Sequence, residues 1–390
     1  MKKPLVVGLS IFIVAAVVGI FVWFSWYKTK PVTNNPDTPA PAVVKPYVDE
    51  VFDKMTLREK VASLFVLHAS GTNPDTLKAF IDQYTPGGFI LMGDNIPSTE
   101  VGLKEITQNL RGSDPRLPYL VAIDEEGGSV KRLAGDTFPS AKTLKNAYPT
   151  VTSDAFIKRS ELVASVGVNL NFGIVADVTN NPNSFIYDRV LGTTPEAASN
   201  NVRAAVGATR GRTLSTLKHF PGHGETTGDS HISVPTTNIS YRSWQAKDMP
   251  PFEAGIQSGS DLVMLGHLRY SSVDSLPASL SKKWHDILRN DLNFKGVAIT
   301  DDMLMLQASG EPAFSDPVAN AIAALNAGNT LLLYVLDNQG AERTKIDPAS
   351  LIDSVVAAVN DGKISKSLID ADVKQVLKLR SGVGAITQNQ

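Results

Sequence analysis

The sequence contains no cysteine among its 390 residues. This absence excludes disulfide bridges, thiolate metal sites, a cysteine nucleophile and the lipidated cysteine of a bacterial lipoprotein. The chain also lacks a charge imbalance, because 37 basic residues face 39 acidic ones, and no run of lysine and arginine stands out. Nucleic-acid binding, which normally requires a basic surface, is therefore not expected.

Charged residues are missing from one long segment near the amino terminus, which runs from Pro4 to Tyr27. As a helix this segment would be roughly 35 Å long, enough to span a bilayer. It is longer than the apolar core of a cleaved signal peptide, and it ends in aromatic residues of the kind favoured at a membrane interface. We therefore expect residues 1–30 to form a retained membrane anchor, with signal cleavage and secretion as the alternative.

The next segment, residues 31–46, is rich in proline and has no hydrophobic face. Such a composition is typical of an extended linker. Positive charges on the two sides of the apolar segment are nearly balanced, so they leave the orientation open. The linker favours a stalk that carries residues 47–385 outside the cytoplasm as a single catalytic domain.

Beyond the linker, short apolar runs alternate with longer amphipathic segments, a pattern typical of a parallel sheet covered by helices. The predicted strands are residues 64–67, 88–91, 119–123, 168–172, 214–217, 262–265, 297–300 and 330–334. Helical patterns between them include residues 75–84, 153–167, 194–211, 282–292 and 317–328. Eight such units predict an α/β fold of the (β/α)8 TIM-type barrel class rather than an open doubly wound sheet.

Polar residues follow several of these predicted strands. Catalytic groups of such barrels lie at the carboxyl ends of the strands, so these positions can be read directly from the sequence. The residues found there are Asp124, Lys218, His219, His267, Asp301 and Asp302. Titratable side chains are therefore expected to converge on one rim of the barrel.

Three of the six histidines, His219, His223 and His231, lie within residues 218–231. A zinc site is one interpretation, although prolines and glycines interrupt the helix that would place two of these histidines on one face. General acid/base catalysis is a second, because Asp229 lies close enough to His231 to fix its tautomer and raise its basicity. A polar turn without chemistry is the third.

Two further motifs carry carboxylates. Asp301 follows an apolar strand, where a carboxylate is costly unless it is used or paired, so it is a candidate nucleophile or electrostatic partner. Asp302 would point the other way and is expected to cap a helix or to support its neighbour. In residues 124–133, Asp124 and Arg132 suit sugar hydroxyls, which both donate and accept hydrogen bonds, with a salt bridge inside the loop as the alternative.

Five segments together resemble the signatures of family 3 glycoside hydrolases, in particular the single-domain β-N-acetylhexosaminidases that act on peptidoglycan fragments. The resemblance covers about residues 50–380. The segments are IDEEGGSVKRL (123–133), YDRVLG (187–192), LKHFPGHGETTGDSH (217–231), DLVMLGH (261–267) and GVAITDDM (296–303).

The resemblance implies a retaining exo-acting enzyme that releases terminal N-acetylglucosamine from peptidoglycan-derived saccharides. Asp301 would attack the anomeric carbon, and His231, paired with Asp229, would protonate the leaving oxygen and later activate water. His223 and His267 would support these groups from behind. The resemblance implies no metal or cofactor and no partner beyond the saccharide. It assigns the sugar hydroxyls to Asp124, Arg132, Arg189, Lys218 and His219.

Three other functions stay open at this point. A β-glucosidase of the same family normally takes its acid from a second domain, for which this chain has no room. A phosphorylase remains an alternative, because a histidine acid/base tolerates an anionic acceptor better than a carboxylate does. A catalytically silent wall-binding module is the alternative from another class, against which the presence of Asp229, His231 and Asp301 argues.

Overall fold

The computed structural model describes residues 46–226, 228–336 and 346–388. The chain from Tyr47 onward forms one compact unit. The predicted anchor at residues 1–30 lies outside the described residues, as does the predicted linker at 31–46 apart from its last residue. Within the described ranges, no helix has both the length and the apolarity needed to cross a membrane.

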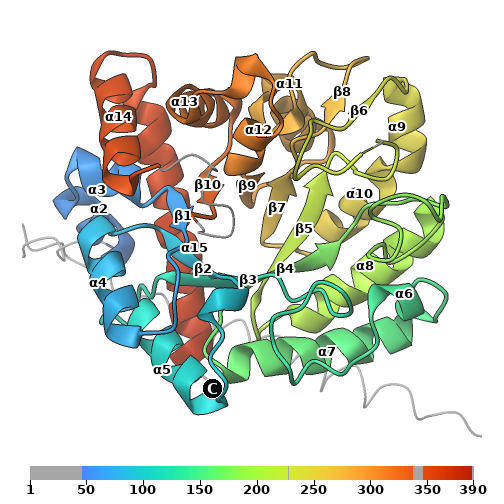
Figure 1. Cartoon of the computed structure of the whole chain (residues 1–390), viewed down its shortest axis with the longest axis horizontal. Coiled ribbons are helices and arrows are strands. Elements are labelled where there is room, and N and C mark those ends of the chain that lie inside the picture. Colours follow the sequence, from blue (N-terminus) through green and yellow to red (C-terminus); the bar gives the residue numbers. More distant parts are fainter. Residues whose placement is uncertain (1–45, 227, 337–345, 389–390) are drawn as a thin grey trace, which may run out of the picture. The chain divides into compact units, whose positions relative to one another are not determined.

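Eight parallel strands close into a barrel in the middle of the molecule (Figure 1). Their order around the barrel is β1, β10, β9, β7, β5, β4, β3, β2, so barrel strands that follow one another along the chain are neighbours in space. The predicted (β/α)8 architecture is confirmed. The barrel strands are β1 (Phe65–Leu67), β2 (Gly88–Leu91), β3 (Leu120–Ile123), β4 (Leu170–Val175), β5 (Leu214–Phe220), β7 (Leu262–Leu265), β9 (Val297–Asp302) and β10 (Leu331–Tyr334).

The barrel strands are largely apolar along the parts that lie in the core, because these parts are buried on both faces. Ile90 and Met264 belong to the central core, whereas their neighbours Phe89 and Val263 pack in separate clusters with residues of the surrounding helices. Successive side chains of a strand point to opposite faces, so alternate residues fill the barrel and contact the helices. Neither face meets water, and the alternation of polar and apolar residues is lost.

Helices surround the strands (Figure 1). Several begin at an N-cap side chain followed by proline: Asn73 and Thr194 accept hydrogen bonds from the backbone of Thr76 and Ala197. Gly328 closes α13 with φ 124°. The main helices are α2 (Tyr47–Lys54), α3 (Leu57–Ala62), α4 (Pro74–Tyr84), α5 (Glu100–Leu110), α7 (Pro149–Ser165), α8 (Pro195–Thr209), α10 (Met249–Gln257), α13 (Pro317–Ala327), α14 (Pro348–Asn360) and α15 (Lys366–Gln388).

Some element boundaries differ from the prediction. The predicted helix at residues 282–292 is a short helix, α11 (Lys282–Asp286), followed by a π-helical turn. The last helix, α15, continues to Gln388, past the expected domain end at 385. A small sheet of β6 (Thr236–Thr237) and β8 (Arg269–Tyr270) was not predicted. Strands of two residues carry too little pattern to be recognised in sequence.

Three barrel strands extend beyond their predicted ends, to Val175 in β4, Phe220 in β5 and Asp302 in β9. The extra residues of β5 and β9 include the charged side chains Lys218 and Asp301. An apolar run marks only the part of a strand that lies in the core. The strand ends that carry the polar groups are therefore the parts that sequence pattern misses.

Candidate active site

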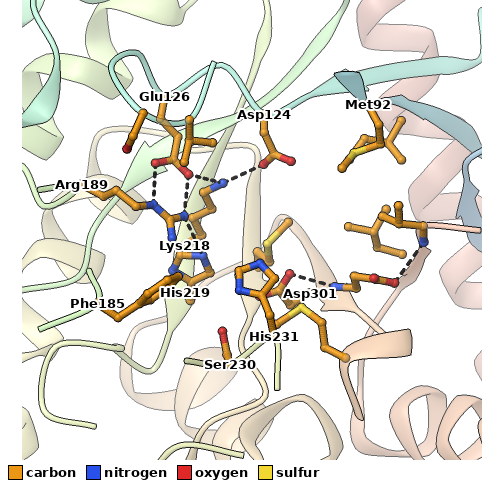
Figure 2. Close-up of a pocket in the computed structure, with 18 of the residues that line it drawn as sticks. Met92, Asp124, Glu126, Phe185, Arg189, Lys218, His219, Ser230, His231 and Asp301 are labelled. Atoms are coloured by element: carbon orange, nitrogen blue, oxygen red, sulfur yellow. Dashed lines mark hydrogen bonds and ion pairs between the residues drawn. The ribbon is translucent and has the colours of Figure 1, made fainter. Parts of the chain in front are cut away.

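A pocket of about 440 Å³ opens among the polar residues at the carboxyl ends of the barrel strands (Figure 2). Volumes of this order are typical of sites for small ligands. Three other predicted site residues do not line the pocket but contact groups near it: Asp229, His223 and His267. The predicted residues that line the pocket are Asp124, Arg132, Arg189, Lys218, His219, His231 and Asp301.

One wall of the pocket is a network of two cations and two carboxylates. Lys218 Nζ donates to Asp124 Oδ1 at 2.8 Å and pairs with Glu126 Oε1 at 2.7 Å. The guanidinium of Arg189 binds both oxygens of Glu126, at 2.9 and 2.7 Å. This two-pronged geometry fixes the orientation of Arg189 as well as its charge. Figure 2 shows the four side chains grouped on one side of the pocket.

The network keeps Glu126 and Lys218 ionised despite their burial. Burial alone would raise the pKa of Glu126, but the charges of Lys218 and Arg189 lower it to about 2. Burial would lower the pKa of Lys218, whereas Asp124 and Glu126 raise it above its ordinary value. The wall therefore offers fixed charges of both signs to a ligand, which suits hydroxyl groups that donate and accept at once.

The turn after β3 places Asp124 and Arg132 at this wall. Glu125 points away from the pocket, and its Oε2 accepts from the backbone nitrogens of Arg132 and Leu133 at 2.8 and 3.0 Å. Gly127 has φ 84°, and a Cβ there would lie 2.1 Å from the guanidinium of Arg159. The tight turn therefore requires glycine.

Arg132 NH2 lies 3.7 Å from Asp124 Oδ2. The salt bridge within the loop, which the sequence left as an alternative, is thus present at long range. Both side chains nevertheless line the pocket. The ion pair and a role in binding hydroxyls are compatible, because this separation leaves hydrogen-bonding positions on both groups unused by each other.

His219 is held between two charged groups. Its Nδ1 lies 2.8 Å from Asp177 Oδ2, and its Nε2 lies 3.4 Å from the guanidinium of Arg189. Asp177 also accepts from the backbone nitrogens of His219 and His223, at 3.2 and 2.7 Å. Burial would raise the pKa of Asp177, but His219 and His223 lower it. This carboxylate therefore ties the end of β5 to the start of the histidine-rich loop.

His223 and His267 are buried and support the site from behind. Burial lowers the pKa of His223 to about 4, and it also lowers the pKa of His267. The Nε2–H of His267 donates to the backbone carbonyl of Asp302 at 2.9 Å, and Ser279 contacts its Nδ1 at 2.7 Å. Both rings are therefore neutral packing and hydrogen-bonding groups near neutral pH.

Asp301 lies at the end of β9 and lines the pocket. Burial would raise the pKa of its carboxyl group, but the rings of His219 and His267 lower it. The backbone N–H of Asp302 contributes to this lowering and donates to Asp301 Oδ1 at 2.8 Å. Asp301 is thus an ionised carboxylate in a concave, partly desolvated position, as a nucleophile requires.

The neighbouring Asp302 has a structural set of contacts. Its Oδ1 accepts from the backbone nitrogens of Leu304 and Val335, at 3.2 and 3.0 Å. The first contact lies at the start of α12 (Leu304–Ala308), whose N-cap residue is Met303, and the second ties β9 to the segment after β10. Asp302 therefore fixes the strand end from which Asp301 projects.

His231 and Asp229 form a pair at the pocket mouth. The Nδ1 of His231 lies 2.6 Å from Asp229 Oδ1, and the two side chains are 52% and 35% exposed. Burial would raise the pKa of Asp229, but its hydrogen bonds from His231 lower it. An ionised carboxylate on Nδ1 leaves Nε2 as the ring atom for proton transfer. His231 lines the pocket that also contains Asp301.

The three histidines of the loop therefore have three different partners: Asp177 for His219, Thr226 for His223 and Asp229 for His231. Across the residues that the structure describes, no group of three or more histidine, aspartate and glutamate side chains has the geometry of a metal site. The arrangement instead has an exposed imidazole at the pocket mouth and fixed charges of both signs along one wall.

The family model for the glycosyl hydrolase family 3 N terminal domain matches residues 56–379. The chain belongs to glycosyl hydrolase family 3. A beta-hexosaminidase of Methylococcus capsulatus is 34% identical over 268 residues, which cover 66% of this chain and 77% of that relative. Beta-hexosaminidase A of Pseudoalteromonas piscicida is 28% identical over 348 residues, which cover 80% of this chain and 56% of that relative.

Solved structures of family 3 enzymes share the fold. A family 3 beta-N-acetylglucosaminidase from Paenibacillus sp. matches with a TM-score of 0.75 and 29% identity over 84% of this chain and 63% of that one. A beta-N-acetylhexosaminidase from Beutenbergia cavernae matches with a TM-score of 0.72 and 25% identity over 84% of this chain and 98% of that one. This family 3 chain is a glycoside hydrolase, and the predicted family and enzyme class are confirmed.

Sequence reasoning missed two carboxylates of the family 3 site, Glu126 and Asp177. Glu126 lies two residues after Asp124, so in extended backbone both point to the same side, and this spacing could have indicated it. Asp177 lies two residues after β4, which ends at Val175. The predicted strand ended at residue 172, so Asp177 was not recognised as a residue at a strand end. Both residues act on partners more than forty positions away, such as Arg189, 63 residues from Glu126, and His219, 42 residues from Asp177.

Proposed function

We propose that this family 3 enzyme is a retaining exo-β-N-acetylglucosaminidase that removes terminal N-acetylglucosamine from peptidoglycan-derived saccharides. The observation that carries the proposal is that the ionised Asp301 and the Asp229-bound His231 line one pocket. A carboxylate and a separate proton-transfer group on either side of a glycosidic bond are the requirements of retaining hydrolysis.

In the first step, an oxygen of Asp301 attacks the anomeric carbon, and the bond from that carbon to the leaving oxygen breaks. His231 gives its Nε2 proton to the leaving oxygen, while Asp229 stabilises the ring through Nδ1. In the second step, Nε2 takes a proton from water, and the water oxygen displaces Asp301. The two inversions at the anomeric carbon give net retention.

The charged wall supports binding of a terminal sugar. Hydroxyl groups of the sugar meet the acceptor Asp124 and the donors Lys218, Arg132, Arg189 and His219, all of which line the pocket. A cavity of about 440 Å³ that closes onto the barrel core accommodates one sugar ring and leaves the rest of the saccharide at the mouth. These features favour cleavage from a chain end.

Specificity for an acetamido sugar is supported by the relatives and by the opposite wall. Met92 lies across the pocket from Arg189 (Figure 2). Leu304, Met305 and Val335 also line the pocket. An apolar wall of this kind stabilises the methyl group of an N-acetyl substituent and gives no hydrogen bond to a hydroxyl in the same place.

The reaction is tested by comparing matched aryl β-N-acetylglucosaminide and aryl β-glucoside, with NMR observation of the first sugar formed. We expect the acetamido substrate to be preferred and the first product to be the β-anomer. An α-anomer as first product contradicts Asp301 as nucleophile. Release of a sugar 1-phosphate when phosphate is added identifies a phosphorylase, and binding without release of the phenol identifies a silent module.

The peptidoglycan substrate rests on the resemblance of the five sequence segments, and the site of action rests on residues 1–46, whose sequence predicts an anchor and a linker. We propose that the catalytic domain works outside the cytoplasm, next to the cell wall. Membrane fractionation of the full chain, followed by protease treatment of intact spheroplasts, tests this. Activity that stays in the cytosolic fraction contradicts it.

A further inference from the structure

Phe185 is a large apolar side chain at the edge of the pocket. It lines the cavity, and it is 43% exposed. Figure 2 shows Phe185, Ser230 and His231 along one edge of the pocket, with Asp124 and Met92 at the other. An apolar side chain exposed beside a polar site is informative, because leaving it in water forfeits the stabilisation that burial would give.

The backbone at Phe185 is firmly held, so its exposure is built into the fold. The next residue, Ile186, is fully buried and packs with Val175 and Val190. Its loop is closed by the hydrogen bond from the backbone of Arg189 to the carbonyl of Ile186, at 2.9 Å. The bidentate pair of Arg189 with Glu126 anchors the same loop to the charged wall of the pocket. Phe185 is thus a fixed surface.

The ring of Phe185 contacts the proton-transfer group. Its centroid lies 5.8 Å from that of His231 in an edge-to-face arrangement with an interplanar angle of 71°, and also 5.8 Å from that of His223. Asp229 occupies Nδ1 of His231, so Nε2 is directed to the oxygen that leaves. Whatever is attached to that oxygen must pass close to the Phe185 ring.

We propose that Phe185 is the leaving-group contact of this enzyme, whose ring packs against the C–H face of the pyranose ring attached to the departing oxygen. This inference rests on the proposed function. Ile232, the residue after His231 in the chain, is also a large apolar residue and is 65% exposed. An apolar surface at this edge recognises the carbon-rich face of a second sugar, whereas the charged wall binds the hydroxyls of the first.

The proposal is tested with two substrates that share the first sugar and differ in what leaves. One is the disaccharide N,N′-diacetylchitobiose, and the other is N-acetylglucosaminyl fluoride, which has no second ring for Phe185 to touch. Phe185→Ala is expected to lower the ratio of kcat/KM for the disaccharide to that for the fluoride roughly tenfold. Phe185→Leu, which keeps an apolar side chain without a ring, is expected to lower this ratio by a smaller factor.

A purely structural role of Phe185 gives a different result. If the ring only held His231 in place, both variants would shift the pH profile for the disaccharide, and a leaving-group contact leaves that profile in position. Tyr148→Ala is the matched control, because Tyr148 is an aromatic residue 82% exposed and is absent from the pocket lining. This variant is expected to leave kcat/KM unchanged for both substrates.

The proposal is overturned if Phe185→Ala lowers kcat/KM equally for both substrates, so that the ratio is unchanged. A displaced pH profile for the disaccharide also overturns it. Failure of the proposed function shows itself separately, because the wild-type enzyme would then hydrolyse neither the disaccharide nor the fluoride. A wild-type enzyme that hydrolyses both substrates and a Phe185→Ala variant that keeps the same ratio refute the leaving-group contact alone.

Discussion

Asp229 binds His231 twice through one oxygen, because its Oδ1 lies 2.6 Å from the imidazole Nδ1 and 2.9 Å from the backbone nitrogen of His231. The contacts are local, since the two residues are two positions apart. The pair therefore keeps its geometry when the loop that carries it shifts. The imidazole reaches the substrate with its tautomer already set.

When this proton-transfer group is removed, the loss of kcat/KM is expected to depend on the leaving group of the substrate. His231→Ala and Asp229→Ala should lower kcat/KM for the disaccharide by about 10² to 10⁴, the usual contribution of general acid catalysis. An aryl N-acetylglucosaminide with an acidic phenol should lose much less in its first step, because its leaving group departs without a proton. Stopped-flow measurement of phenol release checks this, and equal losses on both substrates contradict the role of His231.

Asp301→Ala is expected to abolish turnover with both classes of substrate, because no other group in the pocket is proposed to attack the anomeric carbon. The variant should still bind N-acetylglucosamine, since the charged wall is untouched. Calorimetric binding together with a turnover assay checks this. Asp302→Ala is the informative neighbour: loss of its bonds to Leu304 and Val335 should lower stability as well as rate.

Glu126 gives a prediction about the direction in which stability changes with pH. Its pKa is lowered from 4.5 to about 2 in the folded protein, by Lys218 and Arg189 acting against burial. A lowered pKa stabilises the fold above the ordinary pKa, and this stability is lost as the pH falls through the folded value. Glu126→Gln should therefore destabilise the enzyme most at neutral pH, by about 3–5 kcal/mol for a broken buried pair.

Denaturant unfolding of wild type and Glu126→Gln between pH 7 and pH 2 measures this difference. The difference in unfolding free energy between wild type and Glu126→Gln should be constant above about pH 5. It should become smaller as the pH falls from there, in keeping with the ordinary pKa of 4.5. Glu100→Gln is the control, because Glu100 is exposed and its ion pair is with Lys104, four residues along the same helix. A gap that stays equal from pH 7 to pH 3 contradicts the lowered pKa.

Much of this site could be predicted from sequence because the barrel rule places catalytic groups at strand ends. Asp124, Lys218 and Asp301 were found in that way, and the structure brings all three to one pocket. The barrel itself was predictable because strands buried on both faces give continuous apolar runs. These two inferences need only local pattern and one rule of topology.

The missed residues are those whose role depends on distant partners. Glu126 becomes a site residue through Arg189 and Lys218, and Asp177 through His219. Local sequence shows only that a carboxylate is present, and it does not show which cation the fold brings to it. The exposure of Phe185 cannot be read from local sequence for a similar reason, because it depends on the burial of the next residue, Ile186.

Glu125 gives the opposite pH dependence from Glu126. Burial raises its pKa to about 7, opposed by the backbone N–H groups of Arg132 and Leu133 and supported by Asp136. A raised pKa means that the folded protein holds the proton more tightly than the unfolded chain, so stability falls as the pH rises from the ordinary value of 4.5 through about 7. Glu125→Gln removes this dependence.

The melting temperature of Glu125→Gln relative to wild type should therefore increase from pH 5 to pH 8. The amide oxygen can still accept from the backbone nitrogens of Arg132 and Leu133, so the turn is kept. Thermal unfolding monitored by circular dichroism at both pH values checks this. A difference between the two proteins that is the same at pH 5 and pH 8 contradicts the raised pKa.

The ion pair beneath the turn offers the last prediction. Arg159 Nε lies 2.6 Å from Asp136 Oδ2, both side chains are fully buried, and the guanidinium packs against Gly127. Arg159→Met leaves Asp136 buried without its cation and should cost about 3–5 kcal/mol of unfolding free energy. Arg159→Met combined with Asp136→Leu removes both charges and should cost less than the single change.

Arg212→Met is the control for this cycle, because Arg212 pairs with Glu161 at the surface and such pairs contribute about 1 kcal/mol or less. Chemical denaturation of wild type, Arg159→Met, Asp136→Leu and the double variant gives the coupling between Arg159 and Asp136. Arg159→Met is costly because it leaves the charge of Asp136 buried without a partner. The double variant, which removes that charge, should therefore be more stable than Arg159→Met. A double variant less stable than Arg159→Met would mean that the unpaired charge left on Asp136 is not what makes the single change costly.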